Sequence, residues 1–181
     1  LKTLLCSSNR LTSLPILPDG LIGLDCSYNP LAAPPSLPDG LKWLSCAGLG
    51  DVLPPALPAT LIELDYSDNG LTSLPVLPDG LEVLNCSGNL LTVLDLSGFT
   101  ALEQLDCSGN HLTALDLSSF SAAGYFDLQA DDQTPALSLT GSDAAGYSAP
   151  VSLNNPSGLA AGITYTEGIL KSTGKPITTT P

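Results

Sequence analysis

The five cysteines of this 181-residue chain carry its most versatile chemistry, because a thiolate can act as a nucleophile, bind zinc or pair in a disulfide. They recur with a spacing near 20 residues or twice that, at Cys6, Cys26, Cys46, Cys86 and Cys107. Zinc ligands usually cluster as C-x-x-C, and the sequence has no such pair. Side chains that recur with a structural repeat point the same way, which is poor geometry for a disulfide. We predict free thiols on an inward apolar ladder, with a disulfide or a metal site as alternatives.

The other side chains suited to catalysis or metal binding do not form a recognisable set. The single histidine, His111, follows Asn110 in a predicted turn, with no nucleophile next to it. The sequence contains no G-x-S-x-G, H-E-x-x-H or phosphate-loop motif. Asp131, Asp132 and Asp143 could offer oxygens to calcium, but their spacing matches no known calcium loop. We therefore predict a protein that is not an enzyme and that holds no cofactor or metal.

The charge of the chain is strongly and unevenly acidic. The formal net charge is −13, all of it within residues 1–134, and no Lys or Arg occurs between Lys42 and Lys171. Such a surface repels nucleic-acid phosphates and anionic membranes, and no apolar run is long enough to span a bilayer. These features predict neither nucleic-acid binding nor membrane insertion. The excess charge favours solubility first, and then a basic protein patch or a cation as the partner.

An internal repeat of 20 or 21 residues must position all of these side chains. Its pattern is L-x-x-L-x-C-x-x-N-x-L, and copies begin at Leu1, Leu21, Leu41, Leu61, Leu81, Leu102 and, in a decayed form, Ala123. One copy cannot bury its apolar face alone, so the copies must stack and share a core. Each x-L-x segment is predicted to form a short strand that pairs in parallel with the next. The asparagines should form a second ladder, in which each amide satisfies buried backbone groups.

Two copies depart from the pattern, and the linkers between strands change along the chain. Leu49 replaces the third asparagine, which predicts a local distortion, and Tyr66 replaces a cysteine, so its hydroxyl needs a buried partner or an edge. The first four copies carry paired prolines, which predict an extended or polyproline-like convex side, and L-P-D-G predicts a turn into the next strand. Later linkers lack proline, and Phe99 and Phe120 are expected to fill the core there.

These motifs resemble the leucine-rich-repeat family over about three quarters of the chain. The L-P-x-G-L-x-x-L form resembles the short repeats of effectors injected by Gram-negative pathogens. The L-D-C-S-x-N-x-L-T-x-L-D-L-S form resembles internalin-like and treponemal surface proteins. The resemblance implies a non-catalytic protein-binding scaffold that is extracellular or on the bacterial surface. Two alternatives stay open: the substrate-recognition region of an effector enzyme whose catalytic domain lies outside this chain, and a structural spacer.

The concave strand face is where a solenoid of this kind is expected to bind its ligand. Residues that flank the inward leucines point outward there, in two columns. The only tryptophan, Trp43, is predicted to be exposed on this face, and an exposed aromatic beside carboxylates is typical of a binding hot spot. The predicted ligand-binding residues are Trp43, Tyr28, Asp25, Glu63, Asp65, Asn85, Gln104, Asp106, Tyr125 and Asp127. The alternatives are that Trp43 only covers the irregular third copy, and that the acids form a solvated face.

Two parts are expected along the chain, a solenoid over residues 1–134 and a β-rich cap over residues 135–181. Turn signals in the second part separate candidate strands at 136–140, 149–153, 163–166, 168–171 and 177–179. This segment is short for an independent sandwich, so it should cover the edge of the last repeat, with a partial Ig-like module as the alternative. Because the chain lacks methionine, we expect a processed product or a piece of a longer protein, and the second is favoured since both ends fall within patterned sequence.

Overall fold

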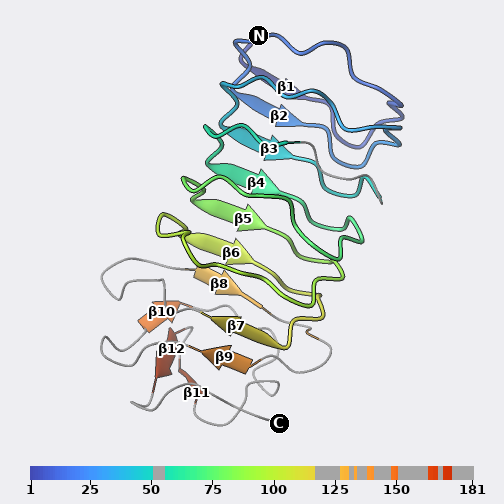
Figure 1. Ribbon diagram of the computed structural model, residues 1–181. Helices are drawn as coiled ribbons and strands as arrows, with labels where there is room; N and C mark the ends of the chain where they lie inside the picture. Colours follow the sequence, from blue (N-terminus) through green and yellow to red (C-terminus); the bar gives the residue numbers. More distant parts are fainter. Residues whose placement is uncertain are drawn as a thin grey trace.

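A stack of short parallel strands forms the main sheet of the computed structural model (Figure 1). The structure describes residues 1–50, 56–116, 127–130, 133, 138–140, 148–150, 163–166 and 169–172. Within these residues the sheet contains β1 (Thr3–Leu5), β2 (Gly23–Asp25), β3 (Trp43–Ser45), β4 (Glu63–Asp65), β5 (Val83–Asn85), β6 (Gln104–Asp106) and β8 (Asp127–Gln129). From β1 to β6 each strand pairs with the same positions of the next repeat. The stack of about six turns confirms the predicted solenoid.

Two smaller sheets lie at the C-terminal end of the stack (Figure 1). One pairs β7 (Ala114–Asp116) in parallel with β9 (Ser138–Thr140). The other is antiparallel, in the order β10 (Ser148–Pro150), β12 (Ile169–Ser172) and β11 (Ile163–Thr166). β10 also contacts β8, the last strand of the main sheet.

These strands overlap four of the five candidate strands predicted beyond residue 134, while 177–179 lies outside the described residues. The division into a solenoid and a cap stays a prediction.

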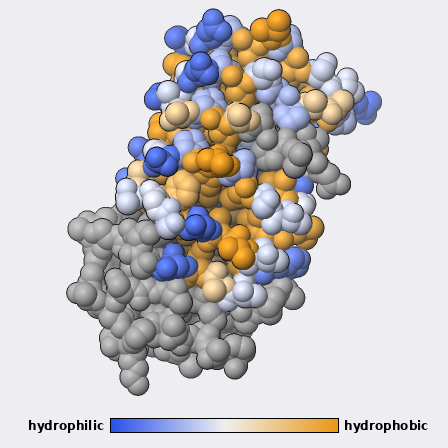
Figure 2. All heavy atoms as spheres, viewed as in Figure 1, coloured by the Kyte–Doolittle hydropathy of each residue, from blue (hydrophilic) through white to orange (hydrophobic). Residues whose placement is uncertain are grey.

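Columns of leucine fill the space between the sheet and the convex linkers. The first leucines of the second to fifth repeats are completely buried. Most leucines at the strand centres, and the cysteines that follow the strands, are buried as well. Because each leucine rests on its equivalents in neighbouring repeats, truncating one to alanine should cost roughly 2–5 kcal/mol. Apolar residues also reach the surface in a band along the stack, interrupted by hydrophilic ones (Figure 2).

The predicted L-P-D-G turns are present before the strands. The N–H of Leu21 donates to the carbonyl of Pro18 at 2.9 Å, and the same bond recurs at Pro38, Pro58 and Pro78. In the fifth repeat the carbonyl of Phe99 takes this place and accepts from Leu102 at 3.2 Å. In the first four repeats, no described residue of the convex linkers lies in a helix or strand, as the prolines predicted. In the sixth repeat, which lacks proline, β7 forms in the linker.

The expectation that aromatic residues fill the convex core holds only in part. Phe99 packs against the leucine cluster but stays half-buried. Phe120 and residues 51–55 of the irregular third repeat lie outside the described part of the chain.

The asparagine ladder forms as predicted and holds each turn to the next. Asn89 donates to the carbonyl of Tyr66 at 2.8 Å and accepts the N–H of Leu71 at 2.9 Å, both from the preceding repeat. Asn29 and Asn110 make the equivalent pair of bonds, and Asn69 donates to the carbonyl of Cys46 and accepts the N–H of Leu49. These four amides are buried, so they satisfy backbone groups that water cannot reach.

Leu49 leaves a gap in this ladder, and the second repeat closes it internally. The N–H of Leu31 donates to the backbone carbonyl of Asn29 at 2.8 Å instead of to a side chain of the next repeat. The side chain of Asn29 also donates to the carbonyl of Cys26 at 3.0 Å. The two groups that a third asparagine would have satisfied therefore have local partners.

Candidate functional site

Trp43 lies flat against the sheet on its outer face. It is the partner of Gly23 in the pairing of β3 with β2, and a Cβ added to Gly23 would overlap its indole ring. The missing side chain of Gly23 therefore provides the space in which the ring packs. Trp43 is half-buried, whereas the sequence predicted an exposed side chain. The prediction was wrong because the ring lies across β2 instead of projecting from β3.

Tyr28 occupies a turn position at which the backbone is left-handed throughout the stack. Positive φ angles between 52° and 64° occur at Ser8, Tyr28, Gly48, Asp68, Gly88 and Gly109, each one residue before the ladder position. The ring of Tyr28 covers Gly48, where a Cβ would overlap it. Its hydroxyl donates to Oδ2 of Asp68 at 2.9 Å, which raises the pKa of Tyr28. Tyr28 is thereby tied across two repeats, yet it stays about half exposed, at 52%.

The acidic column is half-buried, and its side chains cap the strand ends. Oδ1 of Asp25 accepts the N–H of Ser27 at 3.0 Å, two residues later. Asp65, Asn85 and Asp106 accept the equivalent N–H at the same distance. These are Asx turns, in which a short polar side chain holds the backbone that follows it. The column is therefore not a simple solvated face.

A chain of hydroxyl bonds runs from Ser27 in the second repeat to Asp65 in the fourth. The hydroxyl of Ser45 donates to Oδ2 of Asp65 at 2.9 Å and accepts from the hydroxyl of Ser27 at 2.7 Å. Ser27 in turn accepts the N–H of Ala47 at 3.1 Å. Because Asp65 also accepts the hydroxyl of Ser67, both of its oxygens are engaged inside the molecule. Asp65 therefore holds the neighbouring serines in place and does not present an unengaged carboxylate to a partner.

Glu63 and Gln104 are the predicted site residues that stay fully available. Both are exposed, and neither side chain forms a hydrogen bond within the described residues. Glu63 is the strand partner of Trp43 in the pairing of β4 with β3. The structure thus brings an aromatic ring and an unengaged carboxylate together on one face.

The last repeat is displaced by two residues from the predicted alignment. Asp127 pairs with Gln104, and Asp106 pairs with Gln129. The copy predicted to begin at Ala123 would place Asp127 opposite Asp106, and this register is wrong. The strand partner of Asp106 is instead the neutral Gln129. The side chain of Asp127 and all of Tyr125 lie outside what the structure describes.

Gln133 completes the ladder in this displaced repeat. Its amide donates to the carbonyl of Cys107 at 2.7 Å and accepts the N–H of Leu112 at 2.9 Å, as the asparagines do. Sequence reasoning missed Gln133 because it kept a spacing of 21 residues and looked for asparagine. A glutamine with the same amide chemistry was the available signal.

All five cysteines are free, as predicted, and all but the half-buried Cys6 are buried. The sulfur atoms of Cys26 and Cys46 are 3.4 Å apart and share a hydrogen bond, which lowers the pKa of Cys26. Burial raises the pKa of Cys86 to about 12. Tyr66 has a buried hydroxyl that finds no partner within the described residues, and burial raises its pKa. The hydroxyl of Tyr66 therefore has neither the buried hydrogen-bond partner nor the exposed position that the sequence predicted, within the described residues.

The described residues contain neither a candidate metal site nor a helix that could span a membrane. No group of three His, Cys, Asp or Glu side chains among these residues could hold a metal ion. The candidate calcium ligands at 131, 132 and 143 lie outside the described residues. No helix in the same part has the length and apolar character needed to cross a bilayer.

Comparisons with known proteins point to the same architecture. The family model described as Leucine Rich repeats (2 copies) matches residues 79–119. YopM from Yersinia enterocolitica WA-314 is 33% identical over 77% of this chain and 30% of its own, with a TM-score of 0.64. The leucine-rich-repeat domain of a Shigella effector is 25% identical over 76% of this chain and 71% of its own, with a TM-score of 0.53.

A third similar structure is the functional domain of InlJ from Listeria monocytogenes, which includes a cysteine ladder. It is 25% identical over 77% of this chain and 40% of its own, with a TM-score of 0.49. The chain thus spans less than half the length of YopM and of this InlJ domain. Among proteins of curated function, none matches the chain. With its parallel strand stack, leucine columns and asparagine ladder, the chain is a leucine-rich-repeat protein related to bacterial repeat proteins such as YopM and the Shigella effector domain.

Proposed function

We propose that this chain is a non-catalytic protein-binding module of an exported bacterial protein, and that its concave face receives a partner with a basic surface. Leucine-rich repeats typically bind proteins, and secreted effectors are among the similar structures. The observation that carries the proposal is the pair formed by Trp43, seated on Gly23, and the unengaged carboxylate of Glu63 on the neighbouring strand.

The seated ring of Trp43 is suited to binding because little conformational freedom is left for it to lose. Ordering a mobile side chain weakens association, and the packing of the indole on β2 removes most of that cost in advance. A Lys or Arg side chain of the partner could stack on the indole face and pair with Glu63. The absence of Lys and Arg between Lys42 and Lys171 means that no basic side chain of that stretch competes for these groups.

The remaining predicted residues have graded roles in this proposal. Gln104 adds an exposed polar side chain two strands from Glu63. Tyr28 offers a half-exposed ring in the turn that follows β2. The acidic column at Asp25, Asp65, Asn85 and Asp106 supplies a half-buried floor whose geometry is held by internal hydrogen bonds. Asp127 belongs to the proposed face as the strand partner of Gln104, and Tyr125 by its sequence position alone.

The test uses a concave variant with Trp43→Ala and Glu63→Arg and a control variant with Asp39→Arg. All three side chains lie outside the buried core, and Asp39 lies in a turn on the convex side, so it matches the charge reversal away from the face. The parent and both variants are used to capture partners from host and bacterial extracts, and the dissociation constant of any captured protein is then measured. We expect the concave variant to bind at least about tenfold more weakly and the control to bind as the parent does. Equal binding by all three proteins would remove the concave face from the proposal.

A second candidate function is the substrate-recognition region of an effector enzyme. It is favoured by the similarity to the leucine-rich-repeat domain of a Shigella effector. The parent gene distinguishes the two, because a catalytic domain encoded downstream supports recognition of a substrate. A purely structural spacer is the third reading, and it predicts that the concave variant loses no interaction at all.

A further inference from the structure

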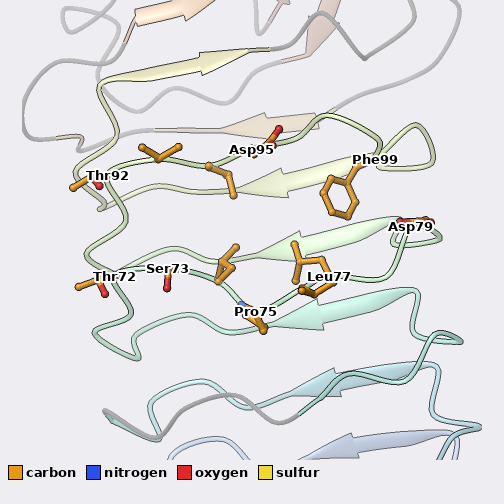
Figure 3. Close-up of a pocket in the computed structure, with 12 residues that line it drawn as sticks. Thr72, Ser73, Pro75, Leu77, Asp79, Thr92, Asp95 and Phe99 are labelled. Atoms are coloured by element: carbon orange, nitrogen blue, oxygen red, sulfur yellow. The ribbon is translucent and has the colours of Figure 1, made fainter.

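An open groove of about 510 Å³ lies on the convex side, between the linkers of the fourth and fifth repeats (Figure 3). Thr72 and Thr92 lie at one end of it, and Asp79 and Phe99 lie at the other. The groove is separate from the strand face, because its walls are the segments 72–79 and 92–99 and not the strands.

The groove opens where two kinds of linker meet. In the first two repeats the linkers are joined by a backbone hydrogen bond from Ala32 to Thr12 at 3.0 Å. Thr92 and Thr72 hold the same positions in the later pair, where the backbone bond lies closer to the strands, from the N–H of Leu90 to the carbonyl of Leu71 at 2.9 Å. A smaller groove of about 290 Å³ lies between the first two linkers, next to Ile16. The change from a proline linker to a longer one without proline therefore accompanies the wider opening.

The walls of the groove carry unused backbone groups. The N–H groups of Ser73, Val76 and Val93 form no hydrogen bond within the described part of the chain. Such a pair of extended, unpaired segments offers main-chain donors and acceptors to an extended peptide, as the edge of a sheet does.

The groove combines an apolar centre with a charged rim. Leu77 and Leu94 form its buried floor, while Val76 and Val93 stand at its edge with 93% and 74% of their surfaces exposed. Exposed apolar side chains next to a recess are typical of an interaction site. These residues form an apolar recess that can receive a side chain of a partner.

The charge of the rim is negative and has no basic neighbour in the sequence. Asp79 and Asp95 line the groove, and the nearest Lys or Arg in sequence is Lys42. Oδ1 of Asp95 accepts the hydrogen bond of the Ser97 N–H at 2.9 Å, and its pKa is lowered by bonding to Ser97. The rim therefore favours a partner that carries a positive charge beside its apolar residue.

We propose that this convex groove, defined by residues 72–79 and 92–99, binds an extended segment of a partner protein that places an apolar side chain between Val76 and Val93 and a Lys or Arg beside Asp79 or Asp95. The backbone of the segment bonds to the unused groups of the linkers. This site is independent of the concave face, so each can fail without the other.

The test uses two fluorescently labelled peptides, acetyl-Lys-Val-Thr-Val-Lys-amide and its acidic twin acetyl-Glu-Val-Thr-Val-Glu-amide. Binding is followed by fluorescence anisotropy up to about 1 mM protein, and the amide shifts of the ¹⁵N-labelled protein locate the peptide. We expect the basic peptide to bind and to shift the amides of Val76 and Val93, and the acidic twin to bind at least about tenfold more weakly.

Three variants separate the parts of the site. Val76→Ser with Val93→Ser removes the apolar edge, Asp79→Asn with Asp95→Asn removes the charge, and Ile16→Ser changes the smaller groove as a control. All five side chains are exposed, so the variants should fold as the parent does. We expect the first two to weaken binding about tenfold each and the control to leave it unchanged.

Four results would overturn the proposal. They are no binding of the basic peptide, equal binding of the acidic twin, equal binding by the variants, and shifts confined to the concave strands.

Discussion

The strand side and the convex side of this solenoid differ in how neighbouring repeats are joined. On the strand side, neighbouring repeats are joined by sheet bonds, by bonds such as Tyr28 N–H to the carbonyl of Ala47 at 2.7 Å and, except at the gap left by Leu49, by the ladder amides. On the convex side, the described linkers share fewer links, such as the bond from the N–H of Ala32 to the carbonyl of Thr12 and the bond from the Thr60 hydroxyl to the carbonyl of Asp39. The strand side therefore sets the register of the repeats, and the convex side follows it.

The physical reason for the difference is burial. Backbone groups beside the asparagine ladder are shut away from water, so each needs a partner inside the protein. Most residues of the convex linkers are exposed or half-buried, so water can satisfy their N–H groups, and proline removes some of these groups altogether. This explains why linkers of different length and composition are tolerated on one side while the turn after each strand keeps its pattern.

The largest expected effect is on the strand side, from Asn89→Ala. The change leaves the carbonyl of Tyr66 and the N–H groups of Asn69 and Leu71 buried without partners. Each such group costs about 1–3 kcal/mol, so the free energy of unfolding in urea should fall by about 3 kcal/mol or more. Asn9→Ala is the matched control, because Asn9 is exposed and bonds only within its own repeat. Equal losses in the two variants would refute the importance of ladder burial.

A somewhat smaller effect is expected from alkaline pH, through Cys86. Burial raises its folded-state pKa to about 12 from the ordinary value of 9.0, so the neutral thiol is favoured in the folded protein. The stability from this shift is complete below pH 9 and is lost as pH rises towards 12, by about 2 kcal/mol at pH 10.5. The free energy of unfolding, measured between pH 8 and 11, should fall less steeply with pH for Cys86→Ala than for the parent. Identical slopes would contradict the shift.

A gain of about 1 kcal/mol is expected from Tyr66→Phe, because the buried hydroxyl has no partner among the described residues. Tyr28→Phe is the counterpart, since that hydroxyl is exposed and bonds to Asp68. It should lower the free energy of unfolding by less than about 1 kcal/mol. Denaturant titrations of the two variants test the comparison, and a loss of stability in Tyr66→Phe would show that its hydroxyl does have a partner.

The smallest effect is expected on the convex side, from Ile16→Ser. Ile16 is fully exposed at 100%, so its replacement should change the free energy of unfolding by less than about 0.5 kcal/mol. The adjacent Leu17 is buried at 6%, and Leu17→Ser should cost roughly 2–5 kcal/mol. Thermal and urea unfolding of this pair measure how sharply burial changes between neighbouring residues of one linker. Similar losses in both would mean that Ile16 packs against the stack.

Much of the fold could be predicted because the pattern repeats. The strand centres at Leu24, Leu44 and Leu64, the inward thiols and the asparagine ladder all follow from positions that return with each copy. The turns at the L-P-D-G tetrapeptides follow from local backbone chemistry, which needs no knowledge of the neighbouring repeats. The prediction failed where the period itself changed, at the displaced last strand that begins at Asp127.

The candidate site was predictable as a face but not as a set of side-chain roles. The sequence placed Trp43 and the acids on the outer side of the strands, and their individual environments depended on residues one or two repeats away. Gly23 lies beneath Trp43, and the hydroxyl chain from Ser27 to Asp65 occupies carboxylate oxygens that appeared free in the sequence. Whether this face binds a protein stays a prediction for the concave variants to test.

The sequence by itself determined the repeat, the apolar columns, the ladder amides and the acidic character, because these depend on residue type and period. The tertiary structure alone decided how Trp43 and Tyr28 are seated, which carboxylates stay free, and where the convex linkers separate into a groove. These features arise from contacts between different copies of the repeat. A glycine in one copy makes room for a ring in another, and no pattern within a single copy contains that information.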